Sequence, residues 1–121
     1  MPRYLTLVRI DETMPDGEPP QALFDAMGKV MEADTADGTL LEAQGLQPTS
    51  AGALATLVDG RITVVDGPFS EAKEVVGGWS IYQLRSKDEA IEKAREFLQL
   101  HADNWPGCAL SVEVRELMEQ E

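Results

Sequence analysis

Two segments of the chain show the helical spacing of apolar residues, and both are flanked by short β-type runs. The first begins at Pro19-Pro20, since proline is tolerated in the first turn of a helix, and ends at Asp37-Gly38. Its apolar face consists of Leu23, Phe24, Met27, Val30 and Met31. The second begins at Ser86, which forms a capping box with Glu89. Its buried stripe consists of Ala90, Ile91, Ala94, Phe97 and Leu98. Helices and strands have different periods, so these patterns predict a fold that mixes both.

Six runs have the composition or alternation of strands. They are residues 3–10, 39–44, 53–58, 61–65, 79–84 and 109–117. Asp59-Gly60 joins the third and fourth runs and predicts a type I′ hairpin. Without this extra hairpin, the order is the β-α-β-β-α-β plan of a ferredoxin-like α+β domain. Two helices on one sheet face leave the other face uncovered, so an apolar outer face would predict a homodimer.

The composition limits the classes of function. With 121 residues the chain is expected to form a single domain, and its net charge of −12 argues against binding to nucleic acid or anionic membranes. No apolar run is long enough for a membrane helix. The single cysteine, Cys108, suits a reducing compartment, so we expect a cytoplasmic protein in which Cys108 is a buried small apolar residue.

The segment from Asp66 to Trp79 holds the densest group of unusual residues. Asp66 ends an apolar run, Gly67 permits a positive φ, and Pro68 fixes φ near −65°. This stiff turn would hold Phe69 and the Asp66 carboxylate in a defined relation. The segment predicts a site, in which a carboxylate beside a lysine is able to act as a general base.

A plainer interpretation stays open for the same residues. A turn of this kind with mixed charges also suits a stiff surface loop, with Asp66 capping backbone amides and Lys73 in an ion pair. Trp79 also suits the core or a dimer interface, and Gly77-Gly78 permits close approach of another backbone or a ligand.

The loop resembles the DGPF-type branch of the YCII-related proteins. The resemblance is specific from Asp66 to Gly78 and extends to the N-terminal strand, the Gly45-Leu46-x-Pro48 element, the Ser86-to-Leu98 helix and the strand at residues 111–115. It implies a ferredoxin-like domain whose sheets pair into a dimeric α+β barrel, with a cleft on each subunit.

The resemblance leaves the reaction open. One branch of the wider superfamily contains a dehydrochlorinase with a histidine–aspartate pair, whose histidine lies in the first helix of YCII-type members. The first helix has no histidine here, so only Asp66 is a candidate for that pair. Other relatives accompany extracytoplasmic-function sigma factors, which implies a regulatory alternative.

Chemistry outside the loop is sparse. His101, the only histidine, is expected to be a partly exposed group near the end of the second helix. The sequence has no metal-ligand spacing and no phosphate-binding glycine loop, so neither a metal nor a cofactor is expected.

Three functions follow from these observations: a small-molecule enzyme or binding protein, a partner-binding module, and a protein whose loop is purely structural. In the first, Asp66 is the catalytic candidate in a cleft at the loop. The predicted ligand-binding residues are Phe69, Lys73, Glu74, Trp79, Arg9, Tyr4 and Tyr82.

Overall fold

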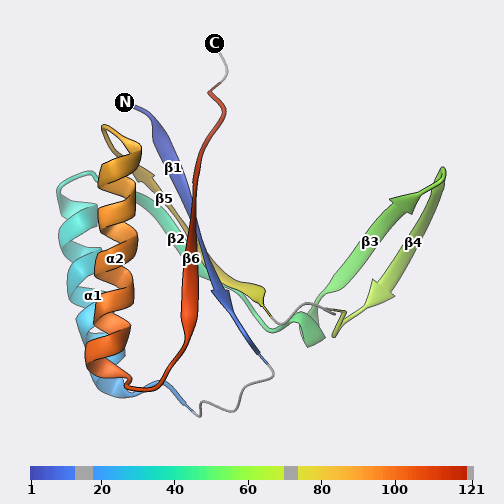
Figure 1. Cartoon of the computed structure of the whole chain (residues 1–121), viewed down its shortest axis with the longest axis horizontal. Helices are drawn as coiled ribbons and strands as arrows, with labels where there is room; N and C mark the ends of the chain where they lie inside the picture. Colours follow the sequence, from blue (N-terminus) through green and yellow to red (C-terminus); the bar gives the residue numbers. More distant parts are fainter. Residues whose placement is uncertain (13–17, 70–73, 120–121) are drawn as a thin grey trace.

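The computed structural model describes residues 1–12, 18–69 and 74–119. Its elements in chain order are β1 (Arg3–Ile10), α1 (Gln21–Ala36), β2 (Leu40–Gly45), the 3₁₀ turn η1 (Thr49–Ala51), β3 (Ala53–Val58), β4 (Arg61–Asp66), β5 (Val75–Gln83), α2 (Lys87–Asn104) and β6 (Leu110–Glu116). Four strands form an antiparallel sheet in the order β2-β5-β1-β6, and β3 and β4 form a separate hairpin (Figure 1). The predicted ferredoxin-like α+β plan with an extra hairpin is therefore confirmed.

The helix ends follow from local chemistry. Pro20 is the N-cap of α1, and Gly38 has φ of 84° beyond its last turn, as expected for a helix stop. At α2 the Ser86 hydroxyl accepts a hydrogen bond from the Glu89 backbone N–H at 3.3 Å. The Glu89 carboxylate in turn accepts from the backbone N–H of Arg85 at 3.0 Å, one residue before the N-cap. Ser86 and Glu89 therefore form a capping box that differs in one bond, because the Glu89 carboxylate binds the N–H of Arg85 instead of the N–H of the N-cap residue Ser86.

Strand β5 begins at Val75, four residues before the predicted start at Trp79. The prediction placed residues 75–78 in the loop segment that precedes the strand. Gly77 instead sits at a bulge, where the pairing with β1 shifts between Val8 and Arg9. A Cβ at Gly77 would lie 2.8 Å from Cδ1 of Ile10, so glycine lets the two strands pack closely.

Both helices cover the same face of the sheet (Figure 1). Tyr4, Leu84 and Ala90 form a buried cluster beneath them. Phe24 and Met31 were expected on the buried face of α1, but they are 52% and 39% exposed. The expectation was wrong for Phe24, because the main contacts of α1 are with α2 and the edge strand β2. Met31 does face inward, where it lines a hollow between the helices and the sheet.

No described element covers the opposite face of the sheet (Figure 1). Side chains alternate along β1, and Tyr4 and Thr6 are buried, so Leu5 and Leu7 point to the outer face. Their partners in the register are Ile81 and Trp79. The outer face therefore has an apolar centre.

The β3–β4 hairpin projects away from the sheet (Figure 1). Asp59 and Gly60 have φ of 52° and 77°, which confirms the type I′ turn. All twelve residues of its two strands are exposed. Large apolar side chains contribute strongly to this surface, and they are Leu54, Leu57, Val58, Ile62, Val64 and Val65.

Candidate functional site

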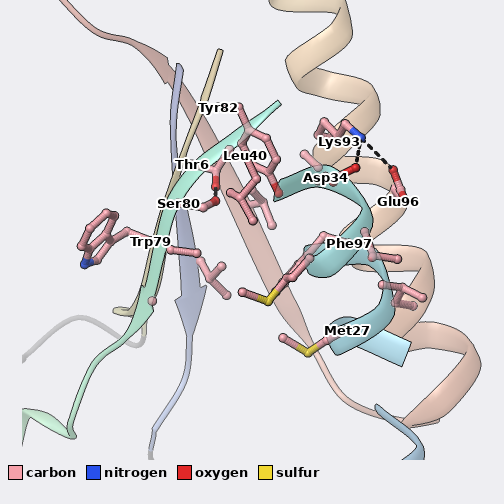
Figure 2. A pocket seen from close by; sticks show the side chains of 18 of the residues that line it. Thr6, Met27, Asp34, Leu40, Trp79, Ser80, Tyr82, Lys93, Glu96 and Phe97 are labelled. Atoms are coloured by element: carbon pink, nitrogen blue, oxygen red, sulfur yellow. Dashed lines mark hydrogen bonds and ion pairs between the residues drawn. The ribbon is translucent and has the colours of Figure 1, made fainter. Parts of the chain in front are cut away.

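A cavity of about 440 Å³ lies between the helices and the sheet, and we call it the interior cavity. Its walls come from all four sheet strands and both helices and are mainly apolar. The apolar side chains include Val8, Ile10, Met27, Val30, Met31, Leu40, Ala94, Phe97, Leu100 and Val112. Figure 2 shows the Met27 side chain reaching from α1 into the space between the layers. A cavity of this size and lining suits a small organic molecule.

Charged groups gather at one end of the interior cavity, where Asp34, Lys93 and Glu96 form what we call the acidic end (Figure 2). The Lys93 ammonium donates to Oδ1 of Asp34 at 2.9 Å and lies 3.7 Å from Oε2 of Glu96. Burial alone would lower the pKa of Lys93, but the hydrogen bond and charge of Asp34, together with the charge of Glu96, raise it above 10.5. Lys93 therefore stays protonated at neutral pH.

Hydroxyl groups line the sheet side of the same cavity. The hydroxyls of Thr6 and Ser80 hydrogen-bond to each other across β1 and β5 (Figure 2). The Tyr82 ring points from β5 toward the helices. Burial raises the pKa of Tyr82, a hydrogen bond with Ser80 opposes that shift, and the negative charge of Asp34 adds to it. Tyr82 therefore remains a neutral phenol.

A second hollow of about 910 Å³ lies at the base of the hairpin, and we call it the loop hollow. Phe69, Arg9 and Glu74 line it, together with backbone and apolar groups from η1, β3 and β5. The Arg9 guanidinium lies 3.6 Å from Glu74 and 3.1 Å from Glu113. Two carboxylates thus already neutralise Arg9, which makes it a poor receptor for an anionic ligand.

The loop turn is held by backbone contact with η1. The Gly67 N–H donates to the Gly52 carbonyl at 2.9 Å. A Cβ at Gly67 would lie only 1.6 Å from the Thr49 carbonyl oxygen, and one at Gly52 would lie 3.5 Å from the Phe69 ring. Gly67 does not adopt the positive φ that glycine permits. Glycine is needed here for close approach instead.

The predicted site residues do not surround one common cleft. Phe69, Glu74 and Arg9 meet at the loop hollow, whereas the Tyr82 side chain lies in the interior cavity. Asp66 is exposed at the end of β4 and lines neither hollow. The expectation of a single cleft is wrong because β5 carries its aromatic residues away from the loop. The individual ligand-binding roles stay predictions.

The remaining predicted residues lie in other places. Tyr4 is 4% exposed in the core, and its hydroxyl donates to Glu116 at 3.1 Å. Trp79 is among the residues that border the interior cavity, but its indole points away from the helices, on the outer face of the sheet (Figure 2). Lys73 lies outside the described residues.

His101 lies in the last turn of α2, as expected, but it is only 7% exposed. The expectation of partial exposure was wrong because its ring packs on Phe97, with centroids 4.5 Å apart, and Nδ1 lies 2.9 Å from the Phe97 carbonyl oxygen. Cys108 is half-buried, and its thiol lies 3.8 Å from the His101 carbonyl oxygen.

Sequence reasoning missed Asp34 and Lys93. A signal for both was present, because Asp34 continues the buried helical series Leu23, Met27 and Val30 at spacings of four, three and four. Lys93 likewise lies between Ala90 and Ala94 on the buried stripe of α2. Charged residues on a buried helix face are rare unless they are paired.

The described residues contain neither a group of metal ligands nor a membrane-spanning helix. Within residues 1–12, 18–69 and 74–119, no three His, Cys, Asp or Glu side chains are grouped as metal ligands would be. In the same ranges no helix has the length and apolar character needed to cross a membrane.

The fold and its cavity define a class: a ferredoxin-like α+β protein with a hollow between its helices and its sheet. Residues 3–117 match the sequence profile of the YCII-related domain family, so the chain belongs to that family of dimeric α+β barrel proteins. An uncharacterized protein of Rhizobium meliloti (strain 1021) is 39% identical over 59 residues. The match covers 49% of this chain and 48% of that protein, so the chain spans about half the relative's length.

Proposed function

We propose that this YCII-related protein binds a small, largely apolar molecule in the interior cavity. The observation that carries the proposal is a space of about 440 Å³ with apolar walls and a few polar groups at one end. Small-molecule sites have this character, with volumes of roughly 300–1,000 Å³. The loop hollow at the predicted DGPF site is a weaker candidate, because its charged groups Arg9 and Glu74 pair with each other.

The proposal is binding rather than catalysis. A lyase of the dehydrochlorinase type would need a base, and α1 carries no histidine. Among the described residues of the interior cavity, the Asp34 carboxylate already accepts a hydrogen bond from Lys93 and is therefore a poor candidate for that base. Asp66, the predicted catalytic residue, lines neither hollow. The reducing cytoplasm expected from the single cysteine suits such a binding protein.

A second proposal concerns a protein partner. The exposed apolar hairpin and the apolar centre of the outer face favour association with another protein. We assign this surface to a second copy of the chain, as expected for paired sheets, rather than to a sigma factor.

A thermal-shift screen with small phenols and phenylalkanols tests the ligand proposal. We expect hits that raise the melting temperature of the wild type but not of Val112→Phe or Ala94→Leu, which fill the cavity from the sheet and helix sides. Asp25→Asn, on the exposed face of α1, should keep the response.

The outcome against the proposal is equally specific. Hits that persist in both cavity variants but disappear in Asp66→Ala would move the site to the loop. The complete absence of hits would remove the binding proposal.

A further inference from the structure

The acidic end of the interior cavity carries more negative than positive charge. Asp34 and Glu96 contribute two carboxylates, and Lys93 contributes one ammonium group. Asp34 is 6% exposed and is paired with Lys93, whereas Glu96, with its side chain 45% exposed, supplies the excess negative charge. A group entering the cavity at this end therefore meets a net negative charge.

One oxygen of Asp34 is buried without a partner. Oδ1 accepts from Lys93 at 2.9 Å, whereas Oδ2 has no hydrogen-bond partner among the described residues. An unsatisfied buried acceptor is costly, and buried polar atoms nearly always have a donor. Rotation about the last side-chain bond of an aspartate costs little energy, so a small rotation is able to turn a carboxylate oxygen of Asp34 toward a donor inside the cavity.

The other polar groups favour the same kind of ligand. Lys93 already donates to Asp34, so an anionic group would face two carboxylates, and the described residues that line the cavity offer it no other cation. Tyr82 is a neutral phenol, and the hydroxyls of Thr6 and Ser80 hydrogen-bond to each other. A protonated nitrogen, by contrast, would neutralise the excess charge and donate to Asp34.

We propose that the ligand of the interior cavity is an amphipathic amine, a proposal that rests on the proposed function. Its protonated nitrogen contacts Asp34 at the acidic end, and its apolar body lies against Met27, Phe97 and Val112. Asp34 is thus the residue that determines the class of ligand.

A matched series of probes tests this inference on the wild-type protein by titration calorimetry at pH 7. The probes are 4-phenylbutylamine, 4-phenylbutanol and 4-phenylbutyrate, which share one apolar body and differ in the head group. We expect the amine to bind at least about tenfold more tightly than the alcohol, since a hydrogen bond to a charged group is the stronger kind, and the carboxylate to bind most weakly.

The variant Asp34→Asn then tests whether Asp34 determines the class of ligand. It should weaken binding of the amine by about tenfold or more while changing binding of the alcohol by less than about threefold. Glu92→Gln is the matched control, because it also removes one carboxylate charge but lies on α2 with its side chain 75% exposed. Circular dichroism and the melting temperature report whether each variant is folded.

Each outcome separates the two proposals. If the alcohol binds and Val112→Phe abolishes its binding, but the amine has no advantage, the cavity proposal stands and the amine inference is overturned. An amine preference that survives in folded Asp34→Asn removes the role of Asp34. Failure of all three probes to bind contradicts both proposals. The wild-type series decides the ligand class even if Asp34→Asn does not fold.

Discussion

At the residue scale, Gly67 carries the clearest steric constraint. Gly67→Ala would place a Cβ 1.6 Å from the Thr49 carbonyl oxygen, so the backbone must shift. We expect a loss of about 1–3 kcal/mol in the free energy of unfolding, measured by urea denaturation. Gly28→Ala is the control, because nothing lies within 4 Å of a Cβ at this exposed position in α1. It should stabilise the protein by about 0.5–1 kcal/mol. Equal effects of the two substitutions would contradict the close contact.

The Asp34–Lys93 ion pair predicts a loss of stability at high pH. Because the pKa of Lys93 is raised above 10.5, the pair stabilises the fold below that pH, and this contribution disappears as the pH rises past it. The pKa of Tyr82 is also raised above its usual value of 10.0, so the free energy of unfolding should fall above pH 10.0 for the same reason. Asp34→Leu combined with Lys93→Met should therefore reduce the alkaline drop in the free energy of unfolding without abolishing it.

The corresponding single substitution should behave differently. Lys93→Met leaves a buried carboxylate unpaired, which we expect to cost about 2–3 kcal/mol, whereas the double variant should unfold at a urea concentration near that of the wild type. The Lys93 side chain is 21% exposed, so the cost lies below that of a fully buried pair. A double variant as unstable as Lys93→Met would contradict this interpretation.

At the scale of elements, α2 depends on its N-terminal cap. Ser86→Ala removes the acceptor for the Glu89 N–H, and we expect a loss of about 1 kcal/mol in the free energy of unfolding. Ser50→Ala, at an exposed position in η1, should change it by less than about 0.5 kcal/mol. Urea denaturation of both variants compares the two sites. A Ser86→Ala protein as stable as Ser50→Ala would show that the cap contributes nothing.

The hairpin is the element least supported by the rest of the chain. A two-stranded hairpin is marginally stable by itself. Leu57 and Ile62 face each other in the register and are 68% and 74% exposed, so they gain nothing from burial within the subunit. The proposed contact with a second copy of the chain would bury these side chains.

At the scale of the whole molecule, the proposed homodimer makes a direct prediction. Leu7→Arg places a charge at the apolar centre of the outer face, opposite Trp79. We expect the wild type to sediment as a dimer and Leu7→Arg as a monomer in analytical ultracentrifugation, because a lone charge buried between sheets is strongly unfavourable. Asp25→Arg, on the exposed side of α1, should remain dimeric. A monomeric wild type would refute the dimer.

The sequence predicted the fold better than it predicted the site. The position of β1 and the Asp59-Gly60 turn follow from local chemistry, and both agree with the structure. The single cleft failed because its residues are separated by whole elements. Phe69 packs beside η1, whereas Tyr82 lies beneath the helices.

The amino-acid sequence by itself determined the order of strands and helices, their caps and the family, because these depend on neighbouring residues and on periods of two and 3.6. Only the tertiary structure decided that Asp34 and Lys93, 59 residues apart, form one ion pair at the end of a cavity. It likewise decided that the helices cover the sheet face that carries Tyr82 and not the face that carries Trp79. Contacts between distant segments depend on how the layers pack, and local patterns carry no measure of that packing.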